Sequence, residues 1–378
     1  MIRMKIKDIC DLQNGRAFKP SDWGTAGLPI IRIQNLNDER APFNYYGGKY
    51  NLAQEVDNGD LLFSWSGTPG TSFGAFLWNR GKGVLNQHIF KVIPKVEVDK
   101  TYLMYALNGN ISTIISKAHG GVGLQHITKK ELDEIEIQMV SISRQKKIVE
   151  ILEKISLLIF LRKQQLAKLD ELVKARFVEM FGELHKTEYN IKTLDELCEF
   201  IKDGTHQTPT YVDATEGYKF LSSKDVTSGY IDWNSIKYIS EELHQELYKR
   251  IAPQRGDILL AKNGTTGIPA IVETDETFDI YVSLALLRLK PNNNVRYIWL
   301  ALRMPETKAQ FDNSLKGVGV PNLHLGEIKK TKIIVPPFSL QNQFAAFVER
   351  VDKQKQTVQQ SLEKLELMKK ALMQEYFG

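Results

Sequence analysis

Two stretches of the chain carry an unbroken helical pattern, residues 143–182 and 339–378. Neither contains an internal Gly or Pro, and both are rich in Leu, Lys, Glu and Gln, which favour helices. Apolar residues recur every seven positions, as they do in a coiled coil. The pattern predicts two long helices of about 60 Å each.

The expected seam lies at matching positions of the two helices. In the second helix it consists of Phe344, Val351, Val358, Leu365 and Leu372, with Phe347, Val348, Leu362 and Met368 beside it. In the first helix it consists of Ile148, Ile155, Leu169 and Leu172, with Arg162 and Arg176 at two seam positions. Polar seam residues commonly fix register and partner, so we predict an antiparallel coiled coil. The alternative is that each helix packs only on its own globular domain.

Residues 1–142 and 187–338 have a different sequence pattern from the two helical stretches. Short β-rich runs, such as 28–33, 60–65 and 88–93, alternate with clusters of Gly, Asn, Ser and Thr. One helical stretch is expected near 102–117. These segments therefore predict two α+β globular domains in tandem, each followed by a long helix.

The chain is internally duplicated. Residues 121–182 align with 317–378 without a gap, with 17 identities in 62 pairs, against roughly four for ordinary compositions. Upstream, the Gly-Asp-Leu-Leu segment at 59–62 matches Gly-Asp-Ile-Leu at 256–259, at an offset of 197. The same offset sets Asn86-Gln87-His88 against Ser283-Leu284-Ala285, so we expect the copies to diverge there. The chain thus contains two copies of one unit, a globular domain followed by a long helix, which form a pseudo-twofold repeat.

The cysteines occupy equivalent places in this repeat. Cys10 matches Cys198 at an offset of 188, which leaves about nine extra residues in the second copy. Neither cysteine has the spacing of a zinc site or a disulfide framework. Both are expected to be buried thiols.

Composition and charge narrow the function. The chain is 42% hydrophobic and 25% charged, as folded soluble proteins are. Its longest apolar run, 155–161, is far shorter than the ~20 residues of a membrane span, and no signal peptide is evident, so we expect a cytoplasmic protein. Residues 1–186 hold 26 Lys+Arg against 20 Asp+Glu, and residues 187–378 hold 24 against 25. The basic first half favours a polyanionic partner.

Catalytic motifs are missing from the sequence. Pro336-Pro337-Phe338 follows Val335, whereas the adenine-methyltransferase motif needs a side-chain amide at that position. The Gly-Val-Gly segments at 121–123 and 317–319 lack the preceding strand and the acidic residue of a nucleotide-binding fingerprint, so we expect tight turns there. Residues 81–83 do not form a P-loop, and the acid-x-Lys of restriction nucleases is absent after Asp257. We therefore predict no catalytic, cofactor-binding or metal-ligating residue, and no enzyme activity in the chain itself.

The order of these features resembles the DNA-specificity subunit of type I restriction-modification systems over essentially the whole chain. The resemblance is carried by the duplicated Gly-Asp-Leu/Ile-Leu strand with its Ser66-Gly67-Thr68 or Asn263-Gly264-Thr265 turn, the Pro336-Pro337 helix start with Gln341, and the Phe-Gly helix ends. The first copy has Ser141-Ile142 in place of the two prolines.

This resemblance implies a function. Residues 1–142 and 187–338 would be target-recognition domains, each binding one half of a bipartite asymmetric site on double-stranded DNA. The helices 143–182 and 339–378 would fix the spacing and dock two methyltransferase (modification) subunits. Restriction subunits would join from outside, and S-adenosylmethionine, ATP and magnesium would be bound by the partner subunits, with none in this chain.

Base contacts are expected from polar and basic loop residues, because Arg pairs with guanine and Asn or Gln with adenine in the major groove. In the first domain the candidates are Arg32, Gln34, Asn35, Trp65, Ser66, Thr68, Thr71, Asn86, Gln87 and His88. In the second domain they are His206, Gln207, Ser222, Lys224, Lys262, Asn263, Thr265 and Thr266. Turn formation is the alternative role for every Ser, Thr and Asn among them.

Two other classes of function stay open at this point. A divergent DNA methyltransferase would bind S-adenosylmethionine as the isolated chain. A purely structural coiled-coil adaptor would show no sequence-dependent DNA binding.

Overall fold

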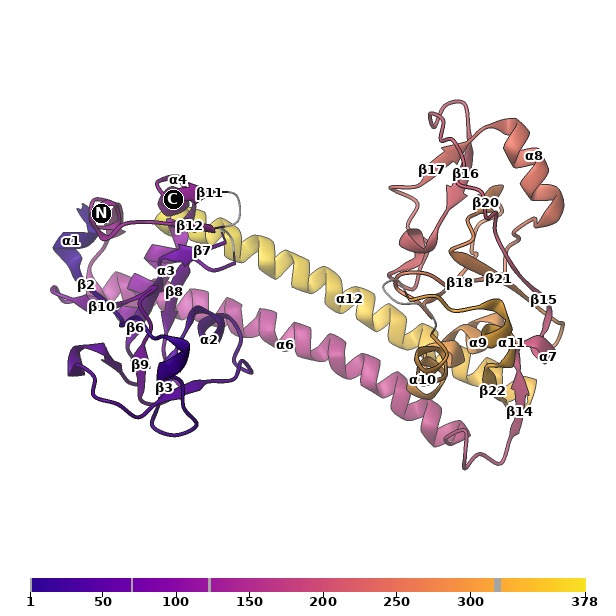
Figure 1. Ribbon diagram of the computed structural model, residues 1–378, viewed down its shortest axis with the longest axis horizontal. Helices are drawn as coiled ribbons and strands as arrows, with labels where there is room; N and C mark the ends of the chain where they lie inside the picture. Colours follow the sequence, from indigo (N-terminus) through magenta and orange to yellow (C-terminus); the bar gives the residue numbers. More distant parts are fainter. Residues whose placement is uncertain (1, 69–70, 122–123, 316–320) are drawn as a thin grey trace. The chain divides into compact units, whose positions relative to one another are not determined.

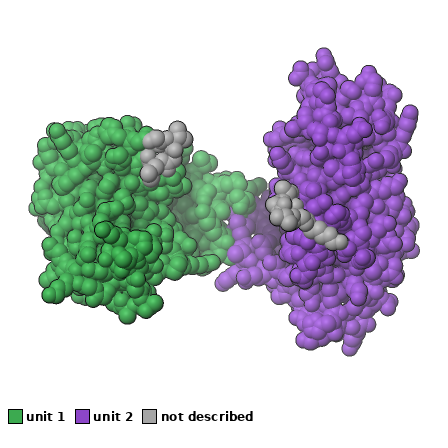
Figure 2. Space-filling model, viewed as in Figure 1, with its two compact units in different colours: residues 1–164, 359–378 green, residues 165–358 purple. Residues whose placement is uncertain are grey.

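The chain folds into two compact units. The computed structural model describes residues 2–68, 71–121, 124–315 and 321–378, so most of the predicted glycine turns, residues 122–123 and 317–319, lie outside the described residues (Figure 1). The first unit comprises residues 1–164 with 359–378, and the second comprises residues 165–358 (Figure 2). Each unit therefore joins one globular domain to parts of both long helices.

The first unit is an α+β fold. Its central sheet has the strand order β2 (Cys10–Asn14), β10 (Ile89–Pro94), β6 (Leu61–Ser64) and β8 (Gly74–Leu77), and a second sheet has the order β4 (Asn44–Tyr46), β3 (Leu28–Ile31), β9 (Gly83–Leu85) and β5 (Glu55–Val56). A third sheet consists of β11 (His119–Gly121), β12 (Leu124–His126) and β7 (Ser66–Gly67), and β1 (Ile2–Lys5) pairs with β13 (Glu136–Met139). Its short helices are α1 (Ile6–Ile9), α2 (Ile33–Asn37), α3 (Lys100–Gly109), α4 (Ile111–Ser116) and α5 (Lys129–Asp133).

The second unit repeats this topology. Its sheets are β15 (Cys198–Asp203), β21 (Leu284–Leu289), β18 (Ile258–Ala261) and β19 (Pro269–Ile271); β17 (Lys237–Ile239), β16 (Tyr218–Leu221) and β20 (Phe278–Ile280); and β14 (Asn190–Thr193) with β22 (Lys332–Val335). Its short helices are α7 (Leu194–Leu197), α8 (Glu241–Arg250), α9 (Val295–Leu302), α10 (Pro305–Asn313) and α11 (Leu325–Lys330). The four-stranded central sheet, the two-stranded sheet and the order of three strands in the remaining pair of sheets are shared, which confirms the internal repeat in three dimensions. Among the described residues, β5 and the β11-β12-β7 sheet have no equivalent in the second unit.

The extra residues of the second copy accumulate in three connections of this fold, starting from an offset of 188 between the first residues of β2 and β15. The offset between equivalent strand starts grows from 190 at β3 and β16 to 193 at β4 and β17, and to 197 at β6 and β18. The last increase accompanies α8, which stands where the first unit has only a short turn and β5. The insertion is therefore a helix added beside the same sheet.

Buried hydrogen bonds are repeated as well. Gln145 and Gln341 are both 1% exposed. The Gln145 side chain donates to the Val140 carbonyl and accepts from the Asp99 amide, at 2.8 and 2.9 Å. Gln341 does the same with Pro336 and Asn294, at 2.9 Å each. Because each buried side-chain amide lies near the start of a long helix and satisfies two backbone groups, its identity in both copies has a structural cause.

The two long helices are α6 (Ile142–Phe181) and α12 (Phe338–Phe377), and each begins one residue before the predicted range. In the first unit the Arg144 guanidinium lies over the Tyr376 ring at 5.9 Å, and further along α6 the Arg162 Nε donates to Ser361 at 3.3 Å. The partner position on α12 thus steps back as α6 advances, so the helices pair antiparallel.

The second unit has the same arrangement. Asp170 forms an ion pair with Lys355, and six residues later Arg176 lies over the Phe347 ring at 6.0 Å. Both predicted seam arginines therefore contact the opposite helix. The antiparallel pairing is confirmed, and the alternative that each helix packs only on its own domain is wrong.

The seam prediction is correct for most positions. Five of its residues are nearly inaccessible: Ile148, Ile155, Phe344, Val351 and Val358. Three are half-buried: Leu169, Leu365 and Leu372.

Leu172 and Met368 are errors in that prediction, with 46% and 52% of their surfaces exposed. The seam advances by alternating steps of three and four residues, so it passes through their neighbours Val173 and Lys369. Because Leu172 and Met368 are apolar, the prediction placed the seam one residue away from its true position. A shift of one residue turns a side chain by about 100° around the helix axis.

The cores lie between the sheets and the long helices. Phe377 of α12 packs in the core of the first unit, and Phe181 of α6 packs in that of the second. Cys10 and Cys198 are buried as predicted, and burial raises the pKa of each thiol to about 12. Within the described part of the chain, no helix has the length and apolarity needed to cross a membrane.

Candidate nucleic-acid interface

One edge of the first unit gathers the loops that carry most of its predicted contact residues. β3 and β9 are parallel, so both end at this edge, and β6 ends beside the start of the antiparallel β10. Backbone hydrogen bonds join the loops: the Asn86 amide donates to the Ile31 carbonyl at 3.0 Å, and the Trp65 amide to the His88 carbonyl at 3.3 Å. The segments after β2, β3, β6 and β9 thus form one continuous loop edge.

The second unit has an equivalent loop edge. The Tyr281 amide donates to the Leu221 carbonyl at 2.8 Å, and the Lys262 amide donates to the Ser283 carbonyl at 2.8 Å. With the bond from the Val282 amide to the Thr205 carbonyl at 2.9 Å, they join the segments after β15, β16, β18 and β20. The shared backbone pattern brings the predicted contact residues of each domain to one side of its sheets.

This backbone pattern corrects one sequence prediction. Asn86 and Tyr281 make the same hydrogen bond, so the true offset here is 195 and the counterparts of Asn86-Gln87-His88 are Tyr281-Val282-Ser283. The expected counterparts Leu284 and Ala285 lie in β21 and are fully buried. The two-residue error arose because the second copy is shorter between β18 and β21, which a single offset could not show.

Trp65 and His88 form the centre of the first loop edge. The Trp65 ring stacks on Phe90 and tilts against His88, with centroid distances of 5.5 and 5.4 Å, and its indole N–H donates to the Asn14 side chain at 3.2 Å. Burial lowers the pKa of His88. Gln87 is exposed, and its amide lies 3.1 Å from the His88 Nε2. A neutral histidine and an exposed amide are therefore presented together.

Other exposed groups surround this centre. Arg32 lies over the Trp23 ring at 5.1 Å, and Trp23 is 41% exposed. Gln34, Thr68 and Thr71 are exposed, and Asn86 is half-buried. Sequence patterns had not singled out Trp23, because only the fold brings it beside Arg32.

Two candidates in the first domain are committed to the interior. Asn35 is 2% exposed, and it accepts from the Arg32 amide at 3.0 Å while donating to the carbonyls of Ala41 and Pro42 at 3.2 Å each. Ser66 is 8% exposed. Both side chains are buried in this conformation, and the hydrogen bonds of Asn35 shape the loop. A base contact by either residue stays a prediction.

In the second domain the charged pair Lys262 and Asp203 occupies the loop edge. The Lys262 ammonium is buried, 5% exposed, and lies 2.6 Å from the Asp203 carboxylate. The Arg250 guanidinium of α8 donates to the carbonyls of Asp203 and Gly204 at 2.8 and 2.7 Å. Thr266 is 6% exposed. Lys262 and Thr266 are therefore interior residues in this structure, and their base contacts stay a prediction.

The remaining candidates of the second domain line the same edge. His206, Gln207, Lys224 and Thr265 are exposed, while Asn263 is half-buried. Ser222 is half-buried, and its hydroxyl donates to Asp225 at 3.0 Å, as a turn-forming serine does. The Tyr281 hydroxyl, 3.2 Å from that of Thr208, was missed, because its place became clear only with the corrected register.

Comparisons with known proteins identify the family of this duplicated fold. The model of the type I restriction modification DNA specificity domain matches residues 3–171 and again 186–367. The chain is 23% identical to the type I restriction enzyme EcoBI specificity subunit of Escherichia coli, covering 93% of this chain and 79% of that protein. It is 24% identical to the MjaVIII specificity subunit of Methanocaldococcus jannaschii, covering 84% and 78%.

Solved structures show the same fold. A crystal structure of the type I S subunit from M. genitalium aligns with a TM-score of 0.54 and 16% identity, covering 100% of this chain and 96% of that one. A chain from a study of complex assembly and conformational transition of the type I R-M system aligns with a TM-score of 0.65 and 14% identity, covering 100% and 97%. With both halves of its repeat matched by one family model, this chain belongs to the DNA-specificity subunits of type I restriction-modification systems.

Proposed function

We propose that this chain selects the DNA sequence for a type I restriction-modification complex, with each globular domain binding one half of a bipartite, asymmetric site. The observation that carries the proposal is the pair of loop edges. Their backbones are joined by the same hydrogen bonds, whereas Trp65, Gln87 and His88 on one are replaced by Lys262, Val282 and Ser283 on the other. Equal scaffolds with different side chains suit two half-sites of different sequence.

The long helices have the proposed role of fixing the spacing between half-sites and docking two methyltransferase subunits. Four large apolar side chains on the outer face of α6 support a protein partner: Leu157, Leu158, Phe160 and Leu161, each between 42% and 55% exposed. Contiguous exposed apolar side chains typically mark an interaction surface. The corresponding positions of α12 carry Lys353, Gln354, Gln356 and Thr357, so this patch belongs to α6 alone.

Catalysis is assigned to the partner subunits. We propose that S-adenosylmethionine, ATP and magnesium bind to methyltransferase and restriction subunits, and that this chain contributes sequence choice and geometry. Calorimetry of the isolated chain with S-adenosylmethionine tests this division, with no heat of binding expected. A micromolar dissociation constant would instead identify the chain as a divergent methyltransferase.

A domain exchange tests the two-domain proposal. Replacing residues 1–142 with the matching domain of a related subunit should change one half of the methylated motif and preserve the other half and the gap. Mapping of methylated bases across a genome measures all three. A change in both halves at once would mean that the domains bind DNA jointly.

A heptad insertion tests the role of the helices. Adding seven residues to both α6 and α12 lengthens each by about 10 Å, or about three base pairs. The gap in the methylated motif should widen by that amount with both halves unchanged. An unaltered gap would show that the helices do not set the spacing.

A further inference from the structure

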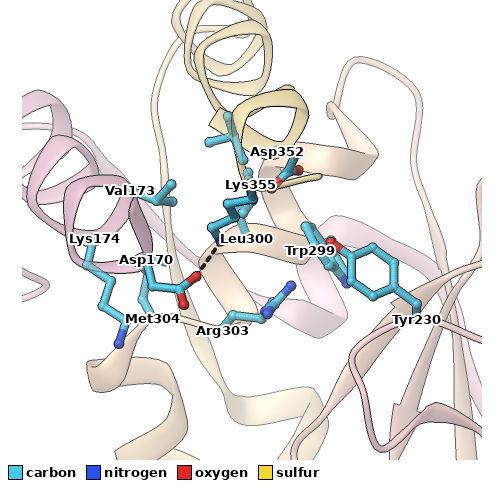
Figure 3. A pocket seen from close by; sticks show the side chains of 11 residues that line it. Asp170, Val173, Lys174, Tyr230, Trp299, Leu300, Arg303, Met304, Asp352 and Lys355 are labelled. Carbon is cyan, nitrogen blue, oxygen red and sulfur yellow. Dashed lines mark hydrogen bonds and ion pairs between the residues drawn. The ribbon is translucent and has the colours of Figure 1, made fainter. Parts of the chain in front are cut away.

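Each unit contains a cavity at the same place in the repeat, between the two long helices and the helices that follow the last strand of the central sheet. The cavity of the second unit has a volume of about 520 Å³ and lies against α6, α9 and α12 (Figure 3). The cavity of the first unit has a volume of about 500 Å³ and lies against α6, α12 and the α3–α4 turn.

Several positions of the two linings correspond. At an offset of 196, Asp170 and Lys174 of the second cavity match Glu366 and Lys370 of the first. Met304 corresponds to Gly109 at an offset of 195. The duplication has therefore produced two versions of one cavity, with a lysine kept at the same point of each.

Each cavity combines an apolar floor with unpaired positive charge. Val173, Leu300 and Met304 line the second cavity, and Ile111, Ile159 and Met373 line the first. The carboxylates are already engaged: Asp170 with Lys355, Asp352 with Arg296 at 2.9 Å, and Glu366 with Lys163 at 2.9 Å.

The remaining cations have no ion pair within the described part of the chain: Lys174 and Arg303 in the second cavity, Lys369 and Lys370 in the first. The Arg303 guanidinium lies over the Trp299 ring at 4.4 Å, beside the half-exposed Tyr230, as Figure 3 shows. Burial, together with the nearby Lys163, lowers the pKa of Lys369. Uncompensated charge in a partly desolvated site favours a negatively charged partner.

We propose that the two cavities are equivalent docking sites, each receiving an acidic segment of a methyltransferase subunit that inserts an apolar side chain. This inference rests on the proposed function, because that function supplies two identical partners for two equivalent sites. The apolar floor favours protein over DNA, since a phosphate backbone has no apolar group to place there.

Charge reversal on the full chain tests the proposal. Lys174→Glu and Lys370→Glu change exposed side chains and should leave each unit folded. The chain is co-expressed with its methyltransferase subunit, and native mass spectrometry counts the bound subunits. Each single variant should bind one subunit where the wild type binds two. At the altered site binding should weaken at least about tenfold, because juxtaposed like charges cost several kcal/mol.

The repeat supplies a matched control. Lys168 and Lys364 are another exposed lysine pair at an offset of 196, on the same helices but outside both cavities. Lys168→Glu and Lys364→Glu, each made singly, change the net charge as much as each single cavity variant does and should leave two subunits bound.

The outcomes separate the possibilities. Unchanged binding of two subunits by the cavity variants would overturn this inference and leave the proposed function intact. A wild-type chain that binds no methyltransferase subunit would overturn both. Weaker, less salt-dependent binding of the isolated double variant to DNA, with two subunits still bound, would assign the cavities to phosphate contacts.

Discussion

The two units share one hydrogen bond at equivalent strand ends, but they make it with different side chains. In the first unit the Trp65 indole donates to Asn14, and in the second the Lys262 ammonium donates to Asp203. Trp65 and Lys262 follow β6 and β18, while Asn14 and Asp203 end β2 and β15. The donor and acceptor keep their places, but a neutral aromatic pair has become an ion pair. Divergence has thus changed both partners of the contact together.

A second difference is confined to the second unit. His244 of the inserted α8 lies 2.7 Å from the Asp279 carboxylate of β20 and stacks on Tyr218 at 3.8 Å. Both members of the pair are buried. Among the residues that the structure describes, the first unit has no counterpart of α8, so there the second unit alone fixes an added helix with a buried ionisable pair. The comparison teaches that the sheets and helix starts are shared, while loop edges and their supports are individual.

The largest expected effect concerns the helix ends. Phe181 of α6 contacts the rings of Tyr297 and Phe344 in the second unit, at 5.3 and 5.5 Å, and Phe377 of α12 contacts Tyr102 in the first at 5.3 Å. Phe181→Ala and Phe377→Ala should each lower the free energy of unfolding by about 3–5 kcal/mol. Hydrogen exchange should speed up mainly in the second unit for the first variant and in the first unit for the second. Equal acceleration in both units would contradict this division.

The next effect tests the shared scaffold. Gln145→Ala and Gln341→Ala each leave two backbone groups without their side-chain partner, which should cost about 1–3 kcal/mol of unfolding free energy in either unit. Urea unfolding of the full chain measures this, with the exposed Gln343→Ala as control. A large loss in one unit and none in the other would show that the repeated hydrogen bonds are not equivalent in energy.

A smaller and separable effect concerns the loop edges. Gln87 and Gln207 are exposed on the first and second edges respectively. If each contacts a base, Gln87→Ala and Gln207→Ala should relax specificity at one position of different half-sites, with a loss of about 1–3 kcal/mol of discrimination each. Methylation mapping reads both halves, and thermal unfolding should be unchanged. Relaxation of the same half-site by both variants would break the comparison.

The smallest effect is a difference in pH dependence. Burial raises the pKa of Asp279 to about 6, against the opposing hydrogen bond from His244. The folded second unit therefore holds this proton more tightly than the unfolded chain, so the stabilisation is complete below about pH 4 and is lost as the pH rises through about 6. Asp279→Asn should remove that slope in unfolding experiments between pH 4 and 7. An identical slope in the variant would contradict the assignment.

The first unit should respond in the opposite direction. A hydrogen bond from Thr128 lowers the pKa of Glu131 to about 2, and a hydrogen bond from Lys5 lowers the pKa of Glu134 to about 2. The two carboxylates therefore contribute to the free energy of unfolding above about pH 4.5, and this contribution is lost as the pH falls toward 2. Glu134→Gln should reduce this acid sensitivity slightly, because the group is at the surface. Hydrogen exchange of β1 and β13 at pH 3 and pH 6 measures it, and an unchanged response would exclude Glu134 as the cause.

The periodic features of the molecule were predictable from the sequence. The two helices, the duplication and the antiparallel seam depend on spacing and composition, which repeat over many residues. Leu172 and Met368 failed because they are apolar neighbours of the seam, and a single residue step decides which side chain faces the partner helix. The loop register failed where the two copies differ by two residues between β18 and β21.

The α+β class, the repeat, the helix pairing and a family resemblance could be predicted from the amino-acid sequence, because all of them follow from local propensity and from self-similarity along the chain. Which polar loop residues are available at the surface depends on the packing of the folded chain. Asn35 and Lys262 look like surface contacts in the sequence, yet both are buried in the folded chain. Asn35 is satisfied by carbonyls of its own loop, at Ala41 and Pro42, whereas Lys262 is satisfied by Asp203 of another strand. A polar side chain's role depends on whether a buried partner is nearby, and the folding of separate segments supplies that partner.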